Sequence, residues 1–128
     1  MFCTNGVDGR ANAARSIADV AARIDDKVRR AKAAEQVVTM FGAERVFMDL
    51  PDNQMDSIPL LKVVRGIEVA LGTFAPDIVY THHGGDLNID HRITHQAVMT
   101  ACRPMPGSSV KAIYAFEVPS STEWASES

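Results

Sequence analysis

Hydrophobic residues along this chain recur either at helical spacing or in short continuous runs. The clearest helical pattern covers residues 58–74, where one apolar stripe repeats every three or four positions. The stripe consists of Leu60, Val64, Ile67, Leu71 and Phe74. Residues 11–41 form a second helix-prone stretch, in which Asp25 or Asp26 could cap a further helix and Gly42 is a natural end.

Short apolar runs predict the strands. They cover residues 45–50, 77–82 and 111–118, and the opening "MFC" reads as the end of another strand. A third helix is expected from about Asp90, as an ordinary N-cap, to Ala101. The adjacent apolar residues of 77–82 are typical of a strand covered on both sheet faces.

Strands and helices alternate with short loops, which predicts an α/β layer with a parallel sheet. Polar clusters follow the strands: "TNGVDGR", "HHGGDLNIDH" and "EVPSSTEW". Ligands of such sheets bind outside the carboxyl ends of the strands. The clusters are therefore expected to converge at one edge of the sheet.

Composition narrows the class of protein. The 128 residues, 46% hydrophobic and 23% charged, are typical of one soluble domain over residues 1–128. A net charge of −3 gives no basic surface for nucleic acid or an anionic membrane, and no apolar run is long enough to span a bilayer. Cys3 and Cys102 match no metal or redox spacing, which favours buried thiols in the cytoplasm.

Every histidine of the chain lies in the window "THHGGDLNIDHRITHQAV": His82, His83, His91 and His95. Histidine and aspartate are common zinc ligands, and His91 at a helix start is well placed to be one. Asp90 beside it could orient a ligand or a water. The i, i+4 pair of His91 and His95 lacks the glutamate of an HExxH motif, and His95 reads better as a packing residue. Ordinary turn chemistry before a helix is the rival interpretation.

A hydrolytic zinc centre needs about three protein ligands, and the window offers one or two. A serine hydrolase using Ser120 or Ser121 with a histidine is a weaker alternative. The sequence has no Gly-x-Ser-x-Gly elbow, and Ser120 with Glu123 is typical of a helix capping box.

The stretches "PDIVYTHHGGDLNIDHRITHQAV", "ACRP" and "YAFEVPSSTEW" resemble the LmbE-like, or PIG-L, deacetylases. The likeness extends upstream through "TNGVDGR" and "RRAKAAEQVVTMFGAERVFMDLPD", and so covers essentially the whole chain. It implies a Rossmann-like three-layer sandwich with a mostly parallel sheet. It also implies a zinc-dependent hydrolase that removes an N-acetyl group from an N-acetylglucosamine-type sugar.

The resemblance assigns roles to particular residues. The histidine of the family's Asp-His pair matches His91, which implies a zinc ligand, and the aspartate matches Asp90, which implies a catalytic role that includes orienting a histidine. Arg30 matches an arginine on the first long helix and is expected at the substrate. Asn88 stands where many members have histidine, and with Asp86 it is expected to contact the substrate.

One family hallmark has no counterpart in this sequence. A His-Pro-Asp-Asp-Glu motif after the family's first strand supplies two zinc ligands and the general base, and these residues are absent. The resemblance therefore implies a domain that lacks the first strand and is cut at both ends. We expect this chain alone to be nearly inactive, with marginal stability, dimerisation or aggregation through open strand edges. A non-catalytic module that binds a sugar or a partner is the alternative function.

Overall fold

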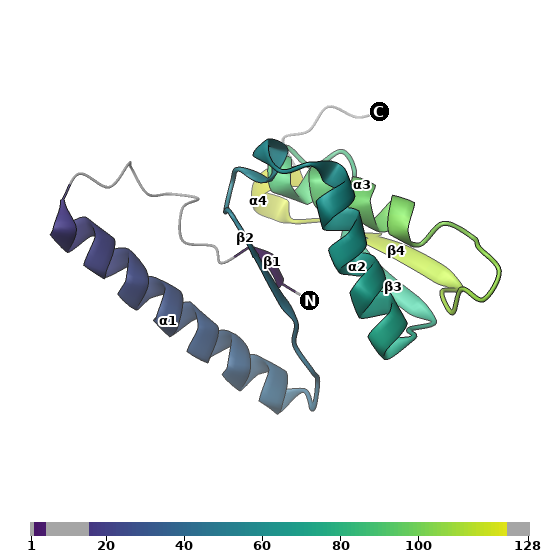
Figure 1. Cartoon of the computed structure of the whole chain (residues 1–128), viewed down its shortest axis with the longest axis horizontal. Helices are drawn as coiled ribbons and strands as arrows, with labels where there is room; N and C mark the ends of the chain where they lie inside the picture. The colour runs from purple at the N-terminus through teal and green to yellow at the C-terminus, as the bar shows by residue number, and fades with distance from the viewer. Residues whose placement is uncertain (1, 5–15, 123–128) are drawn as a thin grey trace. The chain divides into compact units, whose positions relative to one another are not determined.

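The computed structural model describes residues 2–4 and 16–122 and groups the chain into two compact units, Met1–Asn53 and Gln54–Ser128 (Figure 1). Each unit is described by itself. The elements follow one another as β1 (Phe2–Thr4), α1 (Ile17–Met40), β2 (Phe47–Leu50), the 3-10 turn η1 (Met55–Ser57), α2 (Leu60–Phe74), β3 (Ile78–His82), α3 (Ile89–Ala101), β4 (Ala112–Phe116) and α4 (Pro119–Thr122). No helix within these ranges has the length and apolar character needed to cross a membrane.

Helix α1 dominates the first unit. Its N-cap is Ser16, whose side-chain oxygen accepts the backbone amide of Asp19 at 3.1 Å. The helix ends before Gly42, which has a φ of 59° and supplies the left-handed conformation that commonly terminates helices. The end predicted from the sequence at Gly42 is thus confirmed.

The expectation of a second helix cap at Asp25 or Asp26 is wrong, because α1 is continuous over its whole length. Asp26 uses its carboxylate between side chains: Arg30 Nε donates to it at 2.9 Å, and Arg29 also donates. These hydrogen bonds, the one from Arg30 first, lower the pKa of Asp26. Pairs at i, i+3 and i, i+4 support a helix interior, which is why the aspartate does not interrupt it.

Strands β1 and β2 pair in parallel in the first unit. Phe2 is opposite Phe47 and Thr4 is opposite Leu50, with an irregularity in the register between them. The Thr4 hydroxyl donates to Asp52 Oδ1 at 3.1 Å and so ties the end of β1 to the turn after β2.

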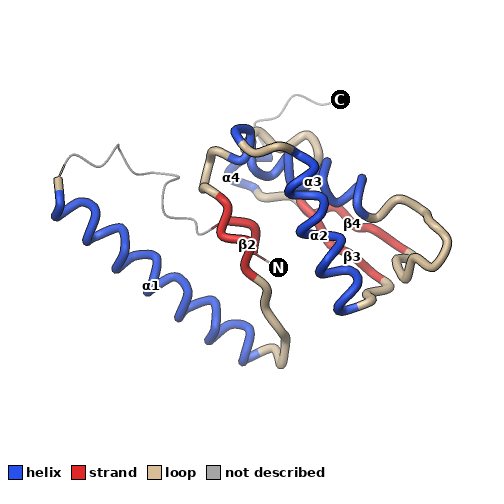
Figure 2. Tube along the Cα trace, in the orientation of Figure 1, coloured by secondary structure: helices blue, strands red, loops and turns tan. Residues whose placement is uncertain are grey.

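In the second unit, α2 packs against α3, and α3 contacts β3 (Figure 2). The core consists of Met55, Val63, Val64, Ile67, Ala97, Val98 and Cys102. The sequence-predicted stripe of α2 is buried in its middle, whereas Leu60 and Phe74 at its ends stay exposed. The helix stops at Ala75, which has a φ of 44° and precedes Pro76.

Strands β3 and β4 pair in parallel without irregularity, from Ile78 opposite Ala112 to His82 opposite Phe116. One side of this pair includes Thr81, which is 3% exposed. The other side is exposed at Ile78, Tyr80, Tyr114 and Phe116. Covering of both faces was expected for this strand, and within the described ranges only one face is covered.

The alternation of helices with parallel strands confirms the predicted α/β, Rossmann-like fold class. The three strands expected inside the chain are all present, each somewhat shorter than its apolar run. A single domain over residues 1–128 stays a prediction.

Candidate functional site

The loop of residues 83–88 leaves β3 at its carboxyl end and is fixed by backbone hydrogen bonds. The amide of His83 donates to the Phe116 carbonyl at 3.1 Å, and the amide of Leu87 donates to the Ser121 carbonyl at 2.9 Å. The loop is thus held against the segment that follows β4. Two of the three polar clusters therefore meet as predicted, whereas residues 5–10 of the first cluster lie outside the described residues.

Asn88 is the N-cap of α3, which corrects the assignment of Asp90 to that position. Its Oδ1 accepts the amides of Asp90 at 2.9 Å and His91 at 3.3 Å. Asp90 lies two residues after the cap position, inside the first turn of the helix, and its side chain is buried. The cap matters to the site because it fixes the backbone from which the His91 side chain projects.

Replacing Asn88 with alanine is expected to lower the free energy of unfolding by about 1 kcal/mol, since two amides at the start of α3 lose their acceptor. Asn88→Ser is the matched control, because serine caps as well as asparagine does. Urea unfolding of the three proteins measures the difference. Equal destabilisation by both substitutions would show that the cap does not hold this helix end.

Asp86 is the most buried charged residue of the site, with no exposed surface. Its Oδ1 accepts the amide of Asn88 at 2.8 Å, and its Oδ2 accepts from His91 Nδ1 at 2.8 Å and from the Ser121 hydroxyl at 3.0 Å. Burial alone would raise the pKa of Asp86, but these hydrogen bonds outweigh it and lower the pKa from 3.8 to about 2. The carboxyl is therefore ionised at neutral pH.

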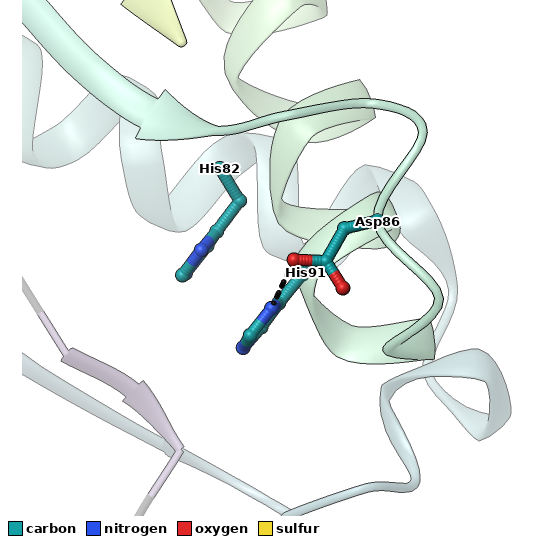
Figure 3. Close-up of side chains that lie close together, drawn as sticks. All are labelled: His82, Asp86 and His91. Atoms are coloured by element: carbon teal, nitrogen blue, oxygen red, sulfur yellow. Dashed lines mark hydrogen bonds and ion pairs between the residues drawn. The ribbon is translucent and has the colours of Figure 1, made fainter. Parts of the chain in front are cut away.

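The Asp86 carboxylate fixes the tautomer of His91. An ionised carboxylate only accepts hydrogen bonds, so His91 Nδ1 carries the proton and donates it (Figure 3). The lone pair of the neutral ring is then on Nε2. Histidines that bind metals have this arrangement, with one ring nitrogen held by a carboxylate and the other presented to the ion.

His82 lies beside His91, with ring centroids 3.9 Å apart and planes within 2° of parallel. Burial, followed by the nearby His91, lowers the pKa of His82 from 6.5, while Asp86 acts in the opposite direction. The ring is accordingly neutral near pH 7. Its Nδ1 is buried and has no hydrogen-bond partner among the described residues.

His82, Asp86 and His91 can each bring one ligand atom within 4.8 Å of the other two. Together they nevertheless do not form a three-ligand chelate. Nitrogen lone pairs lie in the ring plane, and the two parallel imidazole planes do not meet at one ion. Both oxygens of Asp86 already accept hydrogen bonds. These three residues therefore offer a metal one ligand atom, His91 Nε2. The Asp86 carboxylate orients the His91 ring.

The remaining sequence-predicted residues make other contacts. Asp90, 6% exposed, accepts the amide of Met55 at 3.0 Å and so joins η1 to the start of α3. The carboxylate bonded to His91 is thus that of Asp86, which was expected to contact substrate. Arg30 lies on α1 in the first unit, where it donates to Asp26. The catalytic role of Asp90 and the substrate roles of Arg30, Asn88 and Asp86 stay predictions.

The other two histidines have structural contacts. His95 donates from Nδ1 to the His82 carbonyl at 2.8 Å, which agrees with the packing role expected for it. A Cβ added to Gly84 would lie 2.9 Å from the His95 ring, so glycine allows the loop to pass this side chain. His83 is exposed and accepts the Gly85 amide at 3.0 Å.

Ser121 is the site residue whose role the sequence did not reveal. It belongs to α4, which begins at Pro119, so the capping box expected from Ser120 does not start this helix, and Glu123 lies outside the described residues. The Ser121 hydroxyl donates to Asp86 and not to a histidine. A serine nucleophile needs a base that takes its proton, and this arrangement does not support one.

A comparison with protein families matches residues 1–102 to the model described as "PIG-L: GlcNAc-PI de-N-acetylase". The matched range includes Asp86, Asn88, Asp90 and His91. Searches of curated proteins and of solved structures gave no match.

Proposed function

Since the chain belongs to the PIG-L family of de-N-acetylases, we propose that it contributes to the zinc-dependent removal of an N-acetyl group from an N-acetylglucosamine-type sugar or sugar conjugate. The observation that carries the proposal is the hydrogen bond of 2.8 Å between His91 Nδ1 and the ionised Asp86. It leaves Nε2 of His91 as the nitrogen for the metal. Membership of the family supports a deacetylase-type hydrolase. We further propose that its metal is zinc and that its substrate is an N-acetylglucosamine-type sugar.

When bound, zinc supplies Lewis-acid activation of water and of the amide carbonyl. The residues of this chain position that chemistry. His91 holds one coordination position, and the carboxylate of Asp86 raises the basicity of its ring and fixes the ring orientation. Asn88 uses Oδ1 for the helix cap, so the contact to substrate that we expect from it comes from its amide nitrogen.

Two further properties agree with this function. An uncharged sugar needs no electrostatic steering, and the net charge of −3 therefore does not oppose its binding. Cys3 and Cys102 are not joined in a disulfide, which supports the cytoplasm as the compartment.

Acetate release from N-acetylglucosamine and its conjugates tests the proposal. The 128 residues contain no His-Pro-Asp-Asp-Glu sequence, so the assay uses the chain alone and the chain fused to a segment that carries it. We expect little turnover from the chain alone and zinc-dependent turnover from the fusion. His91→Ala in the fusion should remove that turnover.

Two results would contradict the proposal. A folded, zinc-loaded fusion that binds the sugar without releasing acetate would indicate the non-catalytic binding module. A fusion that keeps full activity after His91→Ala would place the metal elsewhere.

A further inference from the structure

Ser121 lies far from His91 in sequence but is joined to it through one carboxylate oxygen. Its hydroxyl is 3.0 Å from Asp86 Oδ2, the same atom that accepts His91 Nδ1 at 2.8 Å. The carbonyl of Val118 is a second acceptor at 3.5 Å, but a hydroxyl has only one proton. The charged acceptor at the shorter distance takes it.

We propose that Ser121 is a positioning residue, which holds the Asp86 carboxylate in the orientation that keeps His91 as a ligand through Nε2. The inference rests on the proposed function of His91 as a metal ligand. Ser121 does not touch the metal or the substrate in this role, and it acts only through Asp86.

The reason lies in how a carboxylate is held. Asp86 can rotate about its last side-chain bond, and contacts to each oxygen are needed to fix its plane. The Asn88 amide holds Oδ1, and the Ser121 hydroxyl holds Oδ2 beside the His91 proton. Without the hydroxyl, Oδ2 loses a donor that holds it beside the His91 proton, so the carboxylate and the imidazole are held less firmly in their present orientation.

The hydroxyl can be removed without detaching its segment. The Ser121 carbonyl accepts the amide of Leu87 at 2.9 Å, and the Ser121 amide donates to the Val118 carbonyl at 2.9 Å. Both contacts use the backbone and remain in Ser121→Ala. Ser120 is exposed and adjacent, and Ser120→Ala therefore provides a matched control on the same turn.

The experiment measures the tautomer of His91 in the metal-free 128-residue chain by long-range proton–nitrogen correlation spectra. Titration with Zn²⁺ alone, followed on the same ring signals, then gives the affinity. We expect the Nδ1-protonated form in the native chain and in Ser120→Ala. Ser121→Ala should raise the fraction of the Nε2-protonated form and weaken Zn²⁺ binding about fivefold. Ser121→Cys has a side chain of similar size but a weaker donor. It should change the tautomer fraction and the Zn²⁺ affinity in the same direction as Ser121→Ala, but by a smaller amount.

A native tautomer in both Ser121→Ala and Ser121→Cys would overturn the proposal, even if Zn²⁺ binding weakened, because a merely structural role does not move the proton. Equal effects of Ser120→Ala and Ser121→Ala would also overturn it. Failure of the proposed function would look different. The native chain would then show no Zn²⁺-dependent change at His91, whereas the tautomer comparison would still decide the role of Ser121.

Discussion

His91→Ala is expected to weaken zinc binding at least about 100-fold and to remove the deacetylase activity that depends on it. The substitution deletes the ring nitrogen that we propose as the metal ligand. The ring of His82 does not replace it, because its plane is parallel to that of His91 and its lone pairs lie in that offset plane. Both losses are measured in the fusion. Competition with a chromogenic zinc chelator gives the loss of zinc affinity, and acetate release gives the loss of activity.

The matched control is His83→Ala. His83 is exposed, lies in the same loop and makes its hydrogen bond to the Gly85 amide, away from Asp86. Zinc affinity should stay within about twofold of the native value in this variant, because no contact to the Asp86–His91 pair is lost. Equal losses in both variants would mean that the effect comes from the loop and not from the His91 ligand.

Asp86→Ala is expected to lower the free energy of unfolding by about 3 kcal/mol. The carboxylate is fully buried, and its removal leaves the Asn88 amide, His91 Nδ1 and the Ser121 hydroxyl without their acceptor. The same substitution should weaken zinc binding by about 10- to 100-fold, because the His91 ring loses its orienting carboxylate. Urea unfolding and the chelator competition measure these effects.

Asp86→Asn keeps the shape of the side chain and removes its negative charge. An amide offers one acceptor oxygen and one donor nitrogen, whereas the site presents donors to both carboxylate oxygens. One side of the amide therefore faces another donor, and we expect an intermediate loss of stability. Asp77→Ala, at an exposed position, is the control and should change stability by less than about 0.5 kcal/mol. An Asp86→Ala variant as stable as that control would contradict the buried hydrogen-bond network.

Acid pH tests the same carboxylate without a mutation. The pKa of Asp86 is about 2 in the folded chain against an ordinary 3.8, so folding favours the ionised form. The stabilisation of about 2 kcal/mol is complete above pH 4 and is lost as the pH falls through 2. The difference in stability between the native chain and Asp86→Asn should shrink over this range. A difference that stays constant from pH 5 to pH 2 would show that Asp86 is not held ionised.

Local patterns in the sequence predicted the elements well where one physical preference dominates. The apolar stripe that ends at Phe74 and the glycine at position 42 mark the ends of two helices, and α2 and α1 end there. The predicted helix cap at Asp26 is wrong, because its carboxylate can either cap a helix or pair with arginine side chains. Arginines one turn later take the side chain that could have capped a helix.

The family was also recognisable from sequence, since the motifs around "DLNIDHR" are specific and the family match covers residues 1–102. The sequence singled out His91 because it starts a helix after a buried strand. It could not decide which nearby carboxylate bonds to that histidine. Asp90 is adjacent in the chain, but its side chain turns to the Met55 amide, and Asp86, five residues before His91, makes the contact.

The sequence by itself therefore determined the α/β fold class and the family, and it pointed to His91 at the start of a helix, because these depend on periodicity and on local motifs. Only the tertiary structure decided the partners of that histidine. The β3–β4 pairing brings Phe116 beside His82, and the turn after β4 then places Ser121 against Asp86. Residues 35 positions apart meet through strand register, which no local pattern specifies. The parallel stacking of His82 on His91 is a second product of that packing, and it leaves one histidine of the window as the metal ligand we propose.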